Sequence, residues 1–174
     1  MLGTEEEART LDPWRELCSE AARVIWNSQT PLEGELAIAF VPGPAPTQDG
    51  KHRVVVGGYS PETRTVLVFI ESLEKVRRDR SYLRQLLRTL AHEVTHAVQH
   101  REHPGLRPGR LGSVTLDAEA YAKDPLERAA VAEESAFDHV LFSESPPPDA
   151  LSRVAAYRAH LTPHLFEMIH ELEK

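Results

Sequence analysis

Three residues in the middle of the chain have the types and the spacing of a metal-dependent catalytic site. His92 and His96 are four positions apart, and Glu93 directly follows the first histidine. On an α-helix, residues at i and i+4 lie one above the other on the same face, so both imidazoles can reach one metal ion. The pattern therefore predicts that His92 and His96 bind zinc.

Glu93 is placed to act on a water molecule at that metal ion. Zinc lowers the pKa of its water to about 7 and polarises a scissile carbonyl, and a neighbouring carboxylate can take up the released proton. We therefore expect Glu93 to be the general base of a hydrolytic reaction. A His-Glu-x-x-His sequence also occurs by chance, and the histidines would then be a solvent-facing pair on a helix.

A zinc site of this kind needs a third protein ligand, and the sequence offers several candidates. The longer pattern with a third histidine is excluded, because Gln99 and Glu102 occupy the positions that would extend it. His100 continues the four-residue series, but it lies a further turn along the same helix and would not readily complete a tetrahedron. The remaining candidates are carboxylates on a later helix: Glu127, Glu133 and Glu134.

The motif and a later segment together resemble a known group of enzymes. Residues 92–100 read H-E-V-T-H-A-V-Q-H and residues 124–130 read D-P-L-E-R-A-A. They look like the gluzincin-type zinc metallopeptidases, and especially compact bacterial and phage members such as the ImmA/IrrE-like proteins. The resemblance covers about residues 83–142. It implies a zincin-like fold, a peptide or protein substrate, Glu93 as base, and three metal ligands: His92, His96 and Glu127.

Departures from the pattern leave the third ligand open. Many relatives have an acidic or aromatic residue four positions after that ligand, where this chain has Val131. Glu134 does have an acidic residue four positions later, and it is therefore a rival ligand. Glu133 lies on the apolar stripe of its helix and could instead hold a ligating histidine. Glu127 could equally complete a capping box with Asp124.

Helices are expected to carry these residues. Apolar side chains recur every three or four positions over residues 81–100, which predicts a helix whose histidines lie off the apolar stripe. Asp124-Pro125 has the residue types of a helix start, as N-cap and first helical residue, and this helix is expected to run to Phe142. Further helices are expected at residues 12–27 and at residues 149–173, the latter interrupted at Pro163.

A small sheet is expected before the motif. Short apolar and β-branched segments predict strands at residues 36–41, 53–56 and 65–70, with residues 57–63 as a hairpin connection. Residues 65–70 are a candidate edge strand for binding an extended substrate, although their composition equally fits a buried central strand. The expected fold class is α+β, with a small and mostly antiparallel sheet, in a single domain over residues 1–174.

Composition limits the class of protein further. The chain has 174 residues, of which 41% are hydrophobic and 27% charged. The net charge of −7 argues against nucleic-acid binding, so the basic residues between Lys75 and Arg80 are expected to be solvated. Cys18 is the only cysteine, which excludes an internal disulfide and a cysteine-based zinc site. Without a secretory leader or a long apolar stretch, we expect a cytoplasmic protein with no membrane partner.

These observations together predict a zinc metallopeptidase, with zinc as its cofactor. A donor to the oxyanion is also needed, and the sequence does not select among its candidates, which are Tyr121, His139, His160 and His164. Two other functions fit the same residues. One is a regulatory metal-binding protein that cleaves or binds a single partner, and the other is a non-catalytic interaction domain. Neither the substrate nor the oligomeric state is indicated by the sequence.

Overall fold

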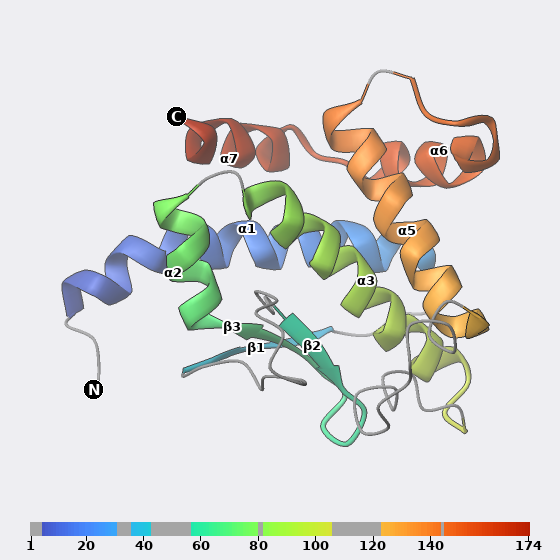
Figure 1. Cartoon of the computed structure of the whole chain (residues 1–174), viewed down its shortest axis with the longest axis horizontal. Coiled ribbons are helices and arrows are strands. Elements are labelled where there is room, and N and C mark those ends of the chain that lie inside the picture. The colour runs from blue at the N-terminus through green and yellow to red at the C-terminus, as the bar shows by residue number, and fades with distance from the viewer. Residues whose placement is uncertain (1–4, 31–35, 43–56, 80–81, 106–122, 144) are drawn as a thin grey trace.

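The computed structural model describes residues 5–30, 36–42, 57–79, 82–105, 123–143 and 145–174. Helices and a three-stranded sheet together form the α+β fold that the sequence predicts (Figure 1). The strand expected at residues 53–56 lies outside the described residues. In order, the elements are α1 (Glu5–Gln29), β1 (Ala37–Val41), β2 (Gly57–Ser60), β3 (Thr65–Phe69), α2 (Ile70–Arg78), α3 (Leu83–Glu102), α5 (Pro125–Phe142), α6 (Leu151–His160) and α7 (Pro163–Glu173).

The sheet is mixed, with the strand order β1-β3-β2. β2 pairs with β3 in the antiparallel sense, as expected, whereas β1 pairs with β3 in the parallel sense. β3 is therefore the central strand, and of the two interpretations of residues 65–70 the edge strand is wrong. Val66 and Val68 are fully buried, which explains the continuous apolar run in this strand. Among the described strands, β2 is the edge that lies against α3.

The hairpin between β2 and β3 is shorter than predicted. Residues 57–60, expected to be part of the connection, form β2 itself, and the turn occupies residues 61–64. Gly57 permits this pairing, because a Cβ atom there would lie 2.7 Å from the carbonyl oxygen of Leu67. Arg64 closes the turn with a φ of 52°, a left-handed conformation that few residues other than glycine adopt.

The helices lie on one side of the sheet, with α1 crossing behind α3 and with α6 and α7 further from the strands (Figure 1). α1 and α3 supply most of the core. α1 begins at Glu5 rather than at the predicted residue 12, with Pro13 inside the helix. Leu11 and Trp14 are both buried, so packing on the two sides of the proline stabilises a helix that Pro13 alone would interrupt.

The region after β3 also differs from the prediction. Ile70 begins α2 instead of ending a strand. Leu73 of this helix is fully buried, while Arg77 and Arg78 are exposed, as expected for these two basic residues. In the C-terminal part, the predicted interruption at Pro163 is confirmed, since it begins α7 after a break that follows α6. No described helix has the length and apolar character needed to cross a membrane.

α3 and α5 pack as an antiparallel pair joined by polar side chains. Arg84, in the first turn of α3, donates two hydrogen bonds to the buried Asp138 near the end of α5. One turn later, Arg88 donates to Glu134 at 2.9 Å. The next residues in this four-residue series are His92 and His96. The same helix face that joins α3 to α5 therefore carries the histidines of the motif.

Candidate metal centre

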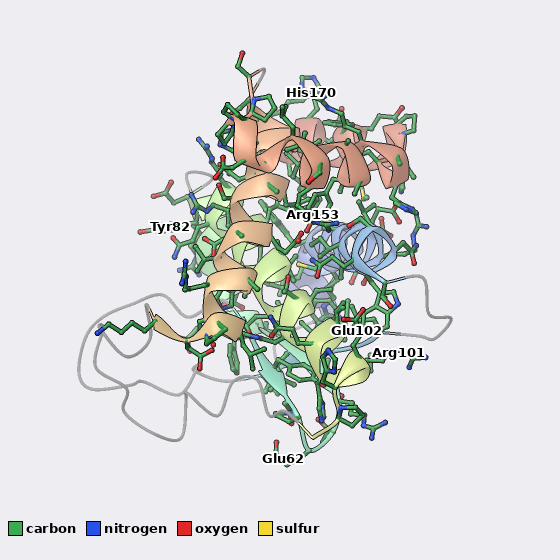
Figure 2. The ribbon with its side chains drawn as sticks, turned by 90° about the vertical axis from the view of Figure 1, so that its right-hand side faces the viewer. Glu62, Tyr82, Arg101, Glu102, Arg153 and His170 are labelled. Carbon is green, nitrogen blue, oxygen red and sulfur yellow. The ribbon has the colours of Figure 1, made fainter. Side chains whose placement is uncertain are left out.

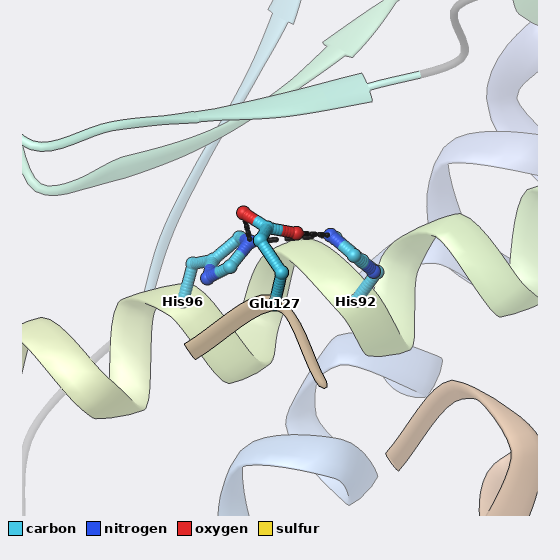
Figure 3. A group of neighbouring side chains, drawn as sticks. All are labelled: His92, His96 and Glu127. Carbon is cyan, nitrogen blue, oxygen red and sulfur yellow. Dashed lines mark hydrogen bonds and ion pairs between the residues drawn. The ribbon is translucent and has the colours of Figure 1, made fainter. Parts of the chain in front are cut away.

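Three of the residues singled out in the sequence meet between α3 and the first turn of α5 (Figure 3). The Nε2 atom of His92 lies 3.0 Å from Oε2 of Glu127, and Nε2 of His96 lies 3.1 Å from Oε1 of the same carboxylate. The two Nε2 atoms are 3.1 Å apart. His92, His96 and Glu127 thus form a group that could hold a metal ion, called the triad below.

The spacing of these atoms fits a common metal ion. Tetrahedral coordination with bonds of 2.0–2.1 Å separates neighbouring ligand atoms by roughly 3.3 Å, close to the distances found here. The side chains of His96 and Glu127 are each only 3% exposed. A carboxylate buried this deeply requires positive charge or hydrogen-bond donors beside it, and a bound cation would supply the charge.

The start of α5 fixes the position of Glu127. The carboxylate of Asp124 accepts hydrogen bonds from the backbone N–H groups of Leu126, at 2.8 Å, and Glu127, at 3.1 Å. Pro125 follows the N-cap, as the sequence predicts. The cap therefore orders the first turn of α5, and the Glu127 side chain extends from that turn to the two histidines.

Gln99 orients His96 and ties it to α5. Its side-chain oxygen lies 2.9 Å from Nδ1 of His96, and its amide nitrogen donates to the carbonyl oxygen of Leu126 at 3.0 Å. With Nδ1–H as the donor to Gln99, the lone pair of His96 is on Nε2, which faces the triad. In the sequence, Gln99 served only to exclude a longer histidine motif, and its spacing of three residues from His96 was the available signal.

Glu134 lies behind His92 instead of beside Glu127. Its Oε2 is 3.3 Å from Nδ1 of His92, the nitrogen that faces away from the triad, and its Oε1 accepts from Arg88. Val131, which stands where relatives have an acidic or aromatic residue, is 44% exposed. The acidic contact to the histidine thus comes from one turn further along α5, at Glu134.

Glu133 does not contact either histidine, so this interpretation of its place on the apolar stripe is wrong. Its carboxylate accepts hydrogen bonds from Arg153, at 2.5 and 3.0 Å, and from the hydroxyl of Tyr157, at 2.6 Å. Gln29 links Tyr157 onward to Thr95 of α3. These partners lie in α1, α3 and α6, far away in the sequence, which is why the apolar stripe of α5 gave no sign of them. Figure 2 shows Arg153 among the helices.

Burial and charge shift the pKa values of two residues of the motif. Burial alone would lower the pKa of His92, but its contacts with Glu127 and Glu134 outweigh this effect and raise the pKa to about 10. Burial raises the pKa of Glu93, against the opposing influence of His96 and His92. In the metal-free protein a proton on His92 therefore supplies positive charge to the carboxylates, and Glu93 is a stronger base than an exposed glutamate.

The other candidate residues lie elsewhere. His100 contacts the hydroxyl of Tyr59 at 2.7 Å through Nδ1 and is not part of the triad. Tyr121 is outside the described residues. His139 is in the last turn of α5, and His160 and His164 are exposed on α6 and α7. The described contacts bring none of these three histidines to the triad.

No family model, curated protein or solved structure matches this chain. Fold and site define an α+β protein with a His-His-Glu group that could hold a metal ion. The resemblance to gluzincins rests on the motif and on the position of Glu127. What the protein does must accordingly be argued from the chemistry of its own residues.

Proposed function

We propose that this protein is a zinc-dependent metallopeptidase of the gluzincin type, with His92, His96 and Glu127 as metal ligands and Glu93 as general base. The observation that carries the proposal is the convergence of two imidazoles and one carboxylate from two helices within metal-ligand distances. Contacts behind both imidazoles support it, because ligating histidines usually have such partners on their second nitrogen.

The set of donor atoms favours zinc among the common metal ions. Two nitrogens and one carboxylate oxygen are typical of catalytic zinc sites with three protein ligands, whereas calcium and magnesium prefer oxygen ligands alone. Zinc held there would supply a Lewis acid that polarises a carbonyl group and acidifies water. Among the described residues, three ligands converge, which would leave the fourth position for water or substrate.

Glu93 supplies the proton transfer in this proposal. It directly follows His92 on α3, and its raised pKa brings a carboxylate closer to neutral pH, where a base can both accept and return a proton. It takes a proton from the attacking water and delivers it to the leaving amine. A glutamine at this position keeps the size of the side chain but cannot carry the proton.

β2 is the natural place for the substrate backbone. It is the sheet edge that packs against α3, and Figure 3 shows strands on the side of α3 from which the triad side chains project. An extended peptide could add to this edge by backbone hydrogen bonds. This assigns to β2 the role that the sequence suggested for residues 65–70.

The metal content of the purified protein tests the proposal. We expect stoichiometric zinc in the wild type, its loss in His96→Ala and Glu127→Ala, and its retention in Glu93→Gln. Arg128→Gln, which changes an exposed residue next to Glu127, is the matched control and should keep zinc. A wild type that binds no zinc even after reconstitution would overturn the proposal, and zinc retained in Glu127→Ala would overturn that ligand.

Peptide cleavage is the second part of the test. Zinc-loaded wild-type protein should cleave members of a mixed peptide library, detected by mass spectrometry, and Glu93→Gln should keep zinc and fold but lose cleavage. Equal cleavage by the two proteins would exclude Glu93 as the base and point to a contaminating protease.

A further inference from the structure

A cavity of about 260 Å³ lies beside the C-terminal half of α3. It is bounded by the end of α1, the start of β1, β2 with its turn, and the residues that follow α3. Its volume is near the lower limit for ligand sites, which suits one side chain or the end of a peptide better than a larger molecule. Its lining includes Trp26, Leu36, Tyr59, Arg64, His100 and Arg101.

The lining combines positive charge with apolar surface. Two exposed arginines, Arg64 and Arg101, line the cavity, although the chain as a whole has a net charge of −7. The guanidinium of Arg101 lies 5.9 Å from the ring of Trp26, and Figure 2 shows Arg101 at the same end of the molecule as the hairpin turn that contains Glu62. Arginine forks are suited to bind carboxylates through two hydrogen bonds.

Two further features concern the polar residues of this lining. The hydroxyl of Tyr59 and Nδ1 of His100 are 2.7 Å apart, which joins β2 to α3. Arg64 sits in the left-handed conformation of the hairpin turn, where asparagine or glycine would be the usual choice. The chain thus places a large cation at a backbone position that disfavours one, at the border of the cavity.

The cavity is close to the triad. His100 follows His96 by one helical turn, a rise of about 6 Å along α3, and Ala97 also lines the cavity. Tyr59 belongs to β2, the sheet edge beside α3. A group bound in the cavity would therefore lie next to the metal centre and at the end of the strand.

We propose that this cavity binds a carboxylate carried on an apolar or aromatic group. Arg64 and Arg101 hold the carboxylate, and Trp26 and Leu36 contact the apolar part. As a binding site the cavity is independent of the metal. A second role of the cavity is to select peptides that have an acidic residue or a free C-terminal carboxylate near the cleaved bond. This second role rests on the proposed function.

Binding of two matched probes to the ¹⁵N-labelled full chain tests the site. N-acetylphenylalanine has the carboxylate, and N-acetylphenylalaninamide lacks only that charge. We expect the acid to shift the indole N–H signal of Trp26 and to bind at least tenfold more tightly than the amide, while Trp14, about 18 Å away along α1, is unaffected. Equal binding of acid and amide, or shifts confined to Trp14, would overturn the proposal.

Variants of the two arginines test whether their positive charges bind the carboxylate. Arg64→Asn suits the positive φ and keeps the turn, and Arg101→Gln keeps the length of the polar side chain. Each should weaken binding of the acid about tenfold and leave binding of the amide unchanged, whereas Arg158→Gln, an exposed residue of α6, should change neither. Unchanged binding of the acid in both cavity variants would overturn the proposal.

Comparison with N-acetylaspartylphenylalaninamide distinguishes the two sources of a carboxylate. Tighter binding of N-acetylphenylalanine assigns the site to a chain terminus, and tighter binding of the aspartyl probe assigns it to an acidic side chain. Binding of neither overturns the site. All titrations are run on metal-free and zinc-treated samples of known metal content, so that failure of the metal centre and failure of this cavity are seen separately.

Discussion

At the scale of single residues, the triad is defined as much by the contacts behind it as by its ligand atoms. Gln99 holds the second nitrogen of His96, and Glu134 holds that of His92. These partners set which nitrogen carries hydrogen and how each ring is turned. The site therefore depends on residues that would not themselves touch a metal ion.

Removing either contact should weaken metal binding without abolishing it. We expect Glu134→Gln and Gln99→Leu each to reduce zinc affinity by about 10–100-fold, because the imidazoles lose orientation and basicity. Competition with a chromogenic chelator measures the affinity. Glu102→Gln, an exposed change on the same helix, is the control and should bind zinc as the wild type does. Unaltered affinity in both variants would show that α3 alone orients the rings.

Metal binding should also release a proton from His92. Its pKa is raised to about 10 in the metal-free protein, so the imidazole is protonated at neutral pH, whereas a ligating imidazole must be neutral. Calorimetric titrations with zinc in buffers of different ionisation enthalpy count the protons. We expect about one per zinc at pH 7–8 and a weaker affinity at lower pH. A heat independent of the buffer would contradict this expectation.

The raised pKa of His92 has the opposite effect on the stability of the metal-free protein: it stabilises the fold at low pH, where zinc affinity is weaker. The folded pKa of His92 lies above the unfolded value of about 6.5. Its ion pairs therefore contribute their full stability below about pH 6.5, and this contribution is lost as the pH rises through about 10. Bound zinc replaces the proton, so this part of the pH dependence should disappear from the free energy of unfolding of the zinc-bound protein.

At the scale of elements, a partly buried polar network connects α1, α3, α5 and α6. Glu133 accepts from Arg153 and Tyr157, and Gln29 donates to Tyr157 and to Thr95, which lies between His92 and His96 in the sequence. Such a network orders the helices only when its members are all satisfied. It joins Thr95 of α3 to α1, α5 and α6.

Loss of Glu133 should therefore destabilise the fold. Glu133→Ala leaves the buried hydroxyl of Tyr157 and the partly buried Arg153 without their acceptor, and we expect a loss of about 2 kcal/mol in the free energy of unfolding. Urea denaturation followed by circular dichroism measures it. Glu167→Ala, an exposed carboxylate of α7, should cost less than about 0.5 kcal/mol. Equal stability of the two variants would show that the network adds nothing.

Some elements could be predicted from the sequence because their signals are local. The bounds of α5 follow from an N-cap, a proline and an apolar stripe, and α3 follows from its period. α2 and the start of α1 were missed, because they depend on burial of Leu73 and Leu11 in a core assembled from distant segments. β2 was missed because two glycines at residues 57–58 indicate a turn, although close backbone packing requires one of them.

The same distinction applies to the candidate site. His92, His96 and Glu93 share one helix, so helical geometry alone placed them together. The sequence could not show which of Glu133 and Glu134 contacts a histidine. Neighbouring positions on α5 differ by about 100° in direction, and the partners of both residues are on other helices. The choice between them required the packing of α5.

At the scale of the whole molecule, the core is closed enough to hide its single thiol. Cys18 is fully buried in α1, and burial raises the pKa of its thiol to about 12. We expect Ellman's reagent at pH 8 to label Cys18 only when the protein unfolds, so that the labelling rate follows the urea-induced transition. Rapid labelling in the native protein would show that α1 opens locally.

The thiol also predicts how stability changes in alkali. Its folded pKa is raised above the unfolded value of about 8.5, so the unfolded chain loses this proton first, and its contribution to stability falls as the pH rises from about 8.5 to about 12. Cys18→Ala removes the thiol. The difference in unfolding free energy between wild type and variant should change by about 1.4 kcal/mol per pH unit in this range, and a constant difference would contradict it.

The four-residue spacing of the polar contacts between α3 and α5 has a consequence for register. A slip of α5 by one turn, about 5.4 Å, would still offer Asp138 to Arg88 and an acidic partner to His92, but it would carry Glu127 away from His96. Repeating contacts thus fix how the two helices face each other but only weakly how far one is shifted along the other. The hydrogen bonds of Gln29 and Tyr157 do not repeat in this way. Gln29 donates to Thr95 of α3 and to Tyr157, and Tyr157 donates to Glu133 of α5, so these bonds favour one alignment of the two helices. The position of Glu127 against His96 therefore depends on the contacts of Glu133, about 9 Å further along α5.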